Sequence, residues 1–191
     1  MILKFLLSSI YFLLLLTNSF FAKEFYIDTL QNNSVKFFAK ATLGNFTGET
    51  NQITGYMGLD SDDTLVTGNV NMEVDLASLD TGNGRRNRHM HEKYLETDLY
   101  PKARYKGKLV KWIAENDSIY TVTTTGTLFI HGVEKTLTKE TKIIKTGELF
   151  QVFLNFKLNV TDFGIKQPRF LISSMNKIVN LQLNFYLKSA E

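Results

Sequence analysis

Residues 178–188 have the sequence IVNLQLNFYLK, in which apolar side chains occupy every second position. Successive side chains of a β-strand point to opposite faces, so a period of two predicts a strand with one apolar and one polar face. Such half-buried strands are typical of antiparallel sheets. The apolar set is Val179, Leu181, Leu183, Phe185 and Leu187.

The same period of two recurs along most of the chain after residue 23. Short stretches rich in Asp, Asn, Ser and Gly separate many of the apolar runs, and Pro101 and Pro168 fall between them, where proline is tolerated. No linker or repeat interrupts the pattern, which indicates one domain. We predict strands at residues 24–29, 34–42, 46–59, 64–76, 102–112, 118–130, 133–145, 149–160 and 177–188.

Many of these predicted strands have about twelve residues, roughly twice the usual length of ~5–6. Long, sequential antiparallel strands favour an all-β fold, either an up-and-down barrel or a deep sandwich. Fifteen phenylalanines favour a wide apolar interior. An outer-membrane barrel would turn its apolar face to lipid, and we consider it unfavourable because the polar faces carry many charges.

The interior of an eight-stranded barrel is either filled by side chains or holds one small ligand. Alternation places the apolar positions of several strands on one continuous inner surface, which we predict to contact a ligand. These positions are Val70, Met72, Val74, Leu128, Ile130, Val152, Leu154, Phe156, Leu181, Leu183 and Phe185.

Residues 1–22 combine an early lysine, Lys4, with a nearly continuous apolar run over residues 5–16 and a small residue, Ala22. This pattern predicts a secretory signal peptide, a mature domain at 23–191 and a periplasmic or secreted location. The apolar run is shorter than the ~20 residues of a spanning helix.

The composition excludes two further features. The chain has no cysteine, so it forms no disulfide. Its 22 basic and 19 acidic residues are too balanced to indicate nucleic-acid binding.

One segment departs from the period of two. Residues 78–101 read SLDTGNGRRNRHMHEKYLETDLYP, with a turn-forming composition followed by a pattern that predicts a helix over 85–95. Met90 and Tyr94 lie four residues apart and are expected to face the barrel, Leu95 and Leu99 to extend the apolar contact, and Pro101 to end the element. A short helix between two long strands most simply caps one end of the barrel.

The same segment contains side chains that could carry chemistry. His89 and His91 are two residues apart, whereas zinc-binding helices place histidines four apart. His131 could join them only through the fold, and we predict a hydrogen bond rather than a metal there. Three arginines within 85–88 form a basic spot without a stripe of partners. We therefore predict no metal, no cofactor, no catalytic residue and no nucleic-acid partner.

Several spaced motifs resemble the YceI-like lipid-binding family. They are Ser78-Leu79-Asp80-Thr81-Gly82-Asn83 with Arg86, His89-Met90 and Tyr100-Pro101; Ser34-Val35 and Phe37 before Gly44-Asn45-Phe46-Thr47-Gly48; Thr127 to Lys135; and Asp162-Phe163-Gly164-Ile165. The resemblance covers the whole mature chain. It implies a single lipocalin-like, antiparallel up-and-down β-barrel of about eight long strands, with a helix at the barrel end and a long apolar chain in an internal tunnel.

Met90 and Tyr94 of the helix are also predicted ligand contacts, by their spacing. Phe37, Phe46 and Phe163 of the family-like motifs complete the set, with Arg86 and His89 as head-group contacts. Two positions differ from the family pattern, because Asn87 replaces a common Asp and Val160 replaces a common Arg. Both changes remove charge from the expected ends of the tunnel.

The expected function is that of an exported binding protein which holds a polyisoprenoid, a quinone-like lipid or a fatty-acid derivative for carriage or storage. We expect no membrane-spanning segment, leave transient membrane contact open, and leave the oligomeric state open between monomer and homodimer. The alternatives are an enzyme acting on a lipid inside the barrel and a structural stress protein whose core is filled by side chains. A continuous cavity would distinguish the binding protein from the filled barrel.

Overall fold

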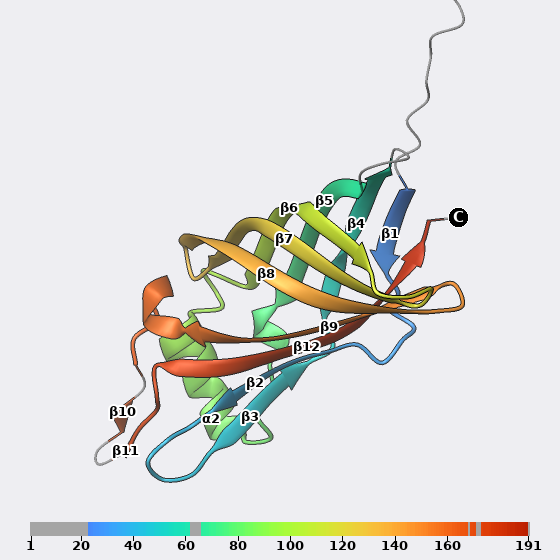
Figure 1. Cartoon of the computed structure of the whole chain (residues 1–191). Coiled ribbons are helices and arrows are strands. Elements are labelled where there is room, and N and C mark those ends of the chain that lie inside the picture. The colour runs from blue at the N-terminus through green and yellow to red at the C-terminus, as the bar shows by residue number, and fades with distance from the viewer. Residues whose placement is uncertain (1–22, 62–65, 168, 171–172, 191) are drawn as a thin grey trace, which may run out of the picture.

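The computed structural model describes residues 23–61, 66–167, 169–170 and 173–190. Within these residues the chain forms a closed antiparallel β-barrel with a short helical segment across one end (Figure 1). The predicted signal peptide, residues 1–22, lies outside the described residues. The strands are β1 (Lys23–Ile27), β2 (Ser34–Ala39), β3 (Phe46–Thr50), β4 (Ile53–Ser61), β5 (Val66–Asp75), β6 (Lys102–Ala114), β7 (Ile119–Ile130), β8 (Val133–Thr146), β9 (Leu149–Asn159), β10 (Arg169–Phe170), β11 (Ser173–Ser174) and β12 (Ile178–Ser189).

The barrel has the up-and-down topology that the sequence predicted. Each long strand pairs with its neighbours in sequence from β4 to β9, β9 pairs with β12, and β12 pairs with β1 to close the sheet. β1 and β2 follow one another along β12, and β3 and β4 follow one another along β2 and β1. The barrel therefore contains eight strand positions, two of which are interrupted.

The predicted strand 46–59 is wrong in one respect, since it is two strands with a break at Asn51 and Gln52. Even-numbered positions are buried before the break, such as Thr50, and odd-numbered positions after it, such as Ile53. The chain thus changes phase by one residue, as at a bulge. The Gln52 backbone N–H donates to the Thr50 hydroxyl, 2.9 Å away, which stabilises the break.

The other predicted strands are present, and their ends differ from the predicted ones by at most three residues. The sequence did not predict the short β10–β11 hairpin, which lies between β9 and β12. Two residues per strand are too few for a period to be recognised.

The inner surface is divided into two apolar clusters, which corrects the expectation of one continuous ligand-contacting surface. The packed core lies in the half of the barrel away from the helix and comprises Phe25, Ile27, Val35, Ile53, Met57, Val70, Leu109, Val122, Ile143, Val152, Phe185 and Leu187. Aromatic rings fill this half, with Phe25 against Phe150 and Trp112 against Tyr120, each pair with ring centres 5.0 Å apart. The helix-end cluster comprises Ala39, Leu76, Leu79, Leu128, Ile130, Leu158, Val160, Phe163, Ile165 and Val179.

The helical segment begins at Gly84, one residue before the predicted start, and ends at Leu95, as predicted. The 3-10 turn η1 (Leu76–Ser78) leads to α2 (Gly84–His89), which continues as the π-helix η2 (Met90–Leu95). The Asn83 side chain accepts a hydrogen bond from the Arg86 backbone N–H, 3.0 Å away, and so caps the N-terminus.

The helix ends before Leu99, which corrects the prediction that this residue extends the apolar contact. Glu96 adopts a left-handed conformation, with φ of 45°, directly after η2. Leu99 lies beyond this turn and is 70% exposed. Pro101 is therefore not the residue that terminates the helix.

Candidate ligand-binding pocket

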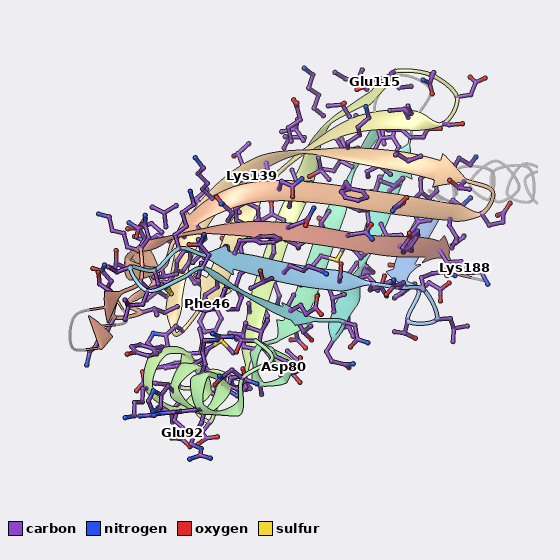
Figure 2. All side chains as sticks on the ribbon, turned by 90° about the horizontal axis from the view of Figure 1, so that it is seen from below. Phe46, Asp80, Glu92, Glu115, Lys139 and Lys188 are labelled. Carbon is purple, nitrogen blue, oxygen red and sulfur yellow. The ribbon has the colours of Figure 1, made fainter. Side chains whose placement is uncertain are left out.

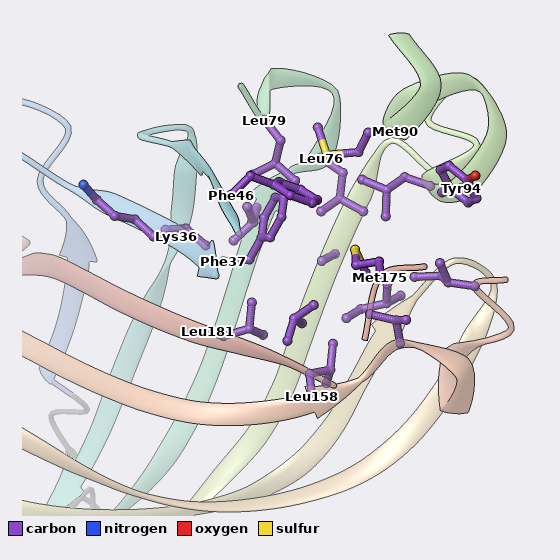
Figure 3. Close-up of a pocket in the computed structure, with 18 of the residues that line it drawn as sticks. Lys36, Phe37, Phe46, Leu76, Leu79, Met90, Tyr94, Leu158, Met175 and Leu181 are labelled. Atoms are coloured by element: carbon purple, nitrogen blue, oxygen red, sulfur yellow. The ribbon is translucent and has the colours of Figure 1, made fainter. Parts of the chain in front are cut away.

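A cavity of about 560 Å³ lies between the helix and the interior of the adjacent barrel half (Figure 3). Its wall is formed by inward-facing residues of seven strands, of η1, and of α2 and η2, with further contributions from the segments flanking β10 and β11. This volume is within the range of ~300–1,000 Å³ that small-molecule sites occupy. The packed core closes the barrel on the other side.

Ten of the sixteen predicted ligand contacts line this pocket. They are Phe37, Phe46, Val74, Met90, Tyr94, Leu128, Ile130, Phe156, Leu181 and Leu183. They come from distant parts of the sequence, and the barrel brings them to one end of the interior. Their contact with a ligand remains a prediction, because their position on the wall establishes only that they are available.

The other six predicted contacts do not lie on the pocket wall. Val70, Val152 and Phe185 belong to the packed core, Met72 packs against it, and Phe163 is buried in the helix-end cluster. Leu154 is half-buried on β9. Alternation selected the correct face of each strand but carries no information about depth along the barrel.

The sequence analysis missed lining residues outside regular alternation. Leu76 lies in η1 and Leu79 directly follows it, while Ala41 and Met175 come from the turn after β2 and the segment after β11. Ala41 and Met175 form an isolated antiparallel bridge, so these two segments lie side by side. No local pattern in the sequence identifies such contacts.

The helix faces the pocket with the side that carries Met90 and Tyr94, as predicted. Met90 and Tyr94 line the cavity (Figure 3), together with Leu95. Arg88 is exposed. Side chains four residues apart share one side of a helix. The helix therefore forms one wall of the pocket.

The predicted head-group residues Arg86 and His89 also line the pocket. The Arg86 guanidinium donates to the hydroxyl and the backbone carbonyl of Thr81, at 2.9 and 2.7 Å, and its carbon lies 4.6 Å from the centre of the Phe46 ring. Arg86 thus connects the helix to β3. None of the ion pairs between described residues involves Arg86.

Asn87, where the family pattern commonly has Asp, bonds to the loop before the helix. Its side-chain oxygen accepts from the backbone N–H and hydroxyl of Thr81, and its NH₂ group donates to an Asp80 carboxylate oxygen, 2.6 Å away. This donated bond, followed by that from the Gly82 backbone N–H, lowers the pKa of Asp80. An aspartate at position 87 would place a second negative charge beside Asp80.

Val160, where the family pattern commonly has Arg, is buried and lines the pocket. This part of the wall is consequently apolar in this chain.

The three histidines occupy separate positions. His131, at the β7–β8 turn, has one ring nitrogen 2.7 Å from a Glu96 carboxylate oxygen, and a His91 ring nitrogen is 3.0 Å from the Leu79 carbonyl. The predicted hydrogen bond of His131 is therefore confirmed, and it ties the helix end to the barrel. Among the residues that the structure describes, no group of three His, Asp or Glu is arranged to hold a metal ion. Within the same residues, no helix has the length and apolarity needed to cross a membrane.

Comparison with known proteins gives consistent matches. A model of the YceI-like domain family matches residues 25–187. Two curated relatives, each a UPF0312 protein, from Pseudomonas savastanoi pv. phaseolicola and Pseudomonas syringae pv. tomato, are 32% identical over 108 residues, which is 52% of this chain and 53% of the relative. The chain therefore spans about half the length of the curated relatives it matches.

Solved structures show the same fold at lower sequence identity. Burkholderia cenocepacia BcnA has a TM-score of 0.67 and 18% identity, over 84% of this chain and 98% of that chain. A polyisoprenoid binding domain from Saccharophagus degradans also has a TM-score of 0.67, with 15% identity over 88% and 99%. The Campylobacter jejuni YCEI protein has a TM-score of 0.57 and 19% identity over 78% and 87%.

Proposed function

This chain belongs to the YceI-like family, and on that premise we propose that it is a binding protein which holds a long-chain amphiphile in the pocket of its barrel. The ligand class is a polyisoprenoid, a quinone-like lipid or a fatty-acid derivative. The name of the Saccharophagus degradans relative as a polyisoprenoid binding domain supports this class. The predicted export supports a carrier or storage role in the periplasm or outside the cell.

The observation that carries the proposal is the apolar cavity of about 560 Å³. Apolar surface transferred from water to such a wall contributes ~25 cal/mol per Å² before the costs of binding. A barrel filled by side chains would have no such cavity, so the pocket favours a binding protein over the structural alternative.

Except for Lys36 on β2, the polar side chains that line the pocket lie on the helix or at its N-terminus. Arg86 and His89 line the wall there, opposite the apolar positions of β9 and β12 such as Leu158 and Leu181. An amphiphile would place its chain against the strands and its polar group beside the helix. The Arg86 guanidinium is held in place by Thr81, so its charge is fixed at the wall where a polar group would lie.

Extraction of the purified protein with organic solvent, followed by mass spectrometry, tests the proposal. We expect a long-chain amphiphile in near-stoichiometric amount. After the lipid is removed, a fluorescent long-chain fatty acid should bind and be displaced by the extracted compound. Protein without extractable lipid and without binding of the probe would contradict the proposal.

Two tryptophan variants of β12 locate the binding site. Leu181→Trp adds bulk to the pocket wall and should reduce probe affinity by about tenfold or more. Asn180→Trp adds the same ring one residue away on the exposed outer face and should leave affinity unchanged. Equal effects of the two substitutions would place the site elsewhere.

A further inference from the structure

We propose that the rim of the pocket at the β2–β3 hairpin docks onto an anionic phospholipid membrane, with Leu43 entering the bilayer. The inference rests on the proposed function, because an amphiphile must pass between a membrane and the pocket. It adds the surface of the protein that contacts the membrane and the orientation of the barrel on the membrane, which the pocket itself does not specify.

The tip of the β2–β3 hairpin, residues 40–45, presents an apolar side chain to solvent. Leu43 is 70% exposed and belongs to neither apolar cluster. Gly44 follows it with φ of 117°, and no heavy atom lies within 4 Å of the place that a Cβ at Gly44 would occupy. The tip therefore projects into open space. A single exposed leucine is common on protein surfaces and does not by itself indicate a binding site. The inference therefore depends on the residues around Leu43.

The hairpin tip is fixed in position by Ser174 of β11 and by the segment that follows it. The Asn176 backbone N–H donates to the Lys40 carbonyl, 2.7 Å away, and the Thr42 backbone N–H donates to the Ser174 carbonyl, 3.1 Å away. Leu43 is thus held outward by a braced turn.

The braced turn forms part of the pocket rim. Ala41 and Met175 line the pocket, and they also border a shallow surface hollow with Lys40, Lys177 and Gln167. Leu43 is two residues from the pocket wall. A membrane that contacts Leu43 would consequently contact the rim.

The same rim carries positive charge. Segments 40–45, 164–167 and 174–177 contain the exposed residues Lys40, Lys166 and Lys177 and no acidic residue. None of these lysines takes part in the ion pairs of the described residues. The adjacent Asp162 accepts a hydrogen bond from the Asn159 side chain instead, at 2.8 Å.

Two turns at the opposite end of the barrel are acidic. The β6–β7 turn, residues 115–118, carries Glu115 and Asp117, the β8–β9 turn carries Glu148, and neither turn contains a basic residue. Lys142 reaches Glu115 from β8, 3.7 Å away. Glu115 lies far from Phe46, which marks the pocket end (Figure 2). An anionic surface would therefore attract the pocket end and repel the far turns.

The combination of an outward leucine and surrounding lysines fits a bilayer better than an acidic protein or a nucleic acid. In a membrane, anionic phosphates lie directly above an apolar layer. The lysines can therefore pair with phosphates while Leu43 is buried in the apolar layer. Neither a phosphate backbone nor a carboxylate-rich surface offers that apolar layer.

Vesicle flotation tests the inference with the full mature chain. We expect binding to vesicles of phosphatidylcholine mixed with phosphatidylglycerol, little binding to phosphatidylcholine alone, and weakening at high salt. Because each lysine near an anionic surface contributes a several-fold change in partitioning, Lys40→Glu/Lys177→Glu should lower binding by about tenfold or more. The control Lys111→Glu/Lys188→Glu makes the same change in net charge on exposed residues away from the rim and should retain binding.

A second matched pair tests insertion. Leu43→Asp should reduce binding several-fold, whereas Leu30→Asp alters a leucine that is 92% exposed on the loop between β1 and β2 and should have no effect. Equal losses within either pair, equal binding to both kinds of vesicle, or equally tight rim-dependent binding to DNA or an acidic protein would overturn the inference.

Binding of a water-soluble fluorescent fatty acid, measured without vesicles, separates the two proposals. All rim variants should bind it as the wild type does. Normal probe binding with no vesicle binding would overturn membrane docking and leave the pocket function in place. Rim-dependent vesicle binding without probe binding would overturn the pocket function and leave membrane docking in place.

Discussion

The ammonium group of Lys139 lies 5.1 Å from the centre of the Phe156 ring, at a place where β8 and β9 no longer pair. The pairing of these strands extends from Thr146–Leu149 to Lys142–Phe153 and ends there, while β9 remains paired with β12. Phe156 lines the pocket, so its ring forms the wall where backbone hydrogen bonds are missing, and the Lys139 ammonium lies over that ring.

This relationship predicts that Phe156 retains the ligand. Phe156→Ala should open the wall to water and increase the dissociation rate of a bound fluorescent fatty acid several-fold, as measured by stopped-flow displacement. Phe153→Ala removes the same ring from the outer face of the same strand, where it is 37% exposed, and should leave the rate unchanged. Identical rates for wild type and Phe156→Ala would show that this wall does not restrict exit.

Two leucines of β12 should differ in their contribution to stability. Leu187 is 1% exposed in the packed core, so Leu187→Ala should lower the free energy of unfolding by ~2–5 kcal/mol through a new cavity. Leu183 lies on the same face but lines an existing cavity, so Leu183→Ala should cost less than about 1.5 kcal/mol. Urea unfolding of lipid-free protein measures both, and equal losses would indicate that the pocket is closed in solution.

Arg86 should discriminate between amphiphiles by charge. Arg86→Gln should reduce the preference for a long-chain carboxylate over the corresponding alcohol by about fivefold, the size of a partly screened ion pair. Arg86→Lys should retain part of it, because charge remains while the two bonds to Thr81 are lost. Arg88→Gln changes an exposed residue of the same helix and should have no effect. Competition binding in low salt provides the measurement.

The contact between Asn87 and Asp80 should make Asn87→Asp destabilising in a pH-dependent way. In the wild type the pKa of Asp80 is lowered below 3.8, first by the bond from Asn87, so this stabilisation is present at neutral pH and lost as pH falls through the lowered pKa. In Asn87→Asp two carboxylates face each other, and protonation of one relieves the repulsion. The deficit in melting temperature should therefore be large at pH 7 and small near pH 4.

The control for this pH effect is Asn176→Asp. The side-chain oxygen of Asn176 accepts a hydrogen bond from the Ile178 backbone N–H, which a carboxylate can also do. Its melting temperature should match the wild type at both pH values. A deficit of Asn87→Asp that does not change with pH would contradict the role assigned to Asp80.

A pair of facing glycines should be required for the close approach of β6 and β7. Gly107 and Gly126 are opposite each other in the register, and a Cβ at Gly126 would overlap backbone atoms of Lys106 and Gly107. Gly126→Ala should cost about 1–3 kcal/mol in urea unfolding. Gly58→Ala, where no heavy atom lies within 4 Å of the new Cβ, should stay within about 1 kcal/mol and serves as the control.

Residues 178–188 show what the sequence by itself determined. Their alternation predicted a long strand, and the observed β12 pairs in a single register with β9 from Ile178 to Lys188. The same reasoning predicted the up-and-down barrel and the position of the helix, because strand period, helix period and turn composition are local properties. Motifs spread along the chain identified the family for the same reason: each is a short run of residues.

The tertiary structure alone decided where the pocket lies. Val152 and Phe156 occupy the same face of β9, yet Val152 is in the packed core and Phe156 lines the cavity. The difference arises from rings such as Phe25 of β1 and Trp112 of β6, which come from other strands and fill only one half of the barrel. Alternation determines which way a side chain points, but the space it meets depends on the volumes of all the strands that face it.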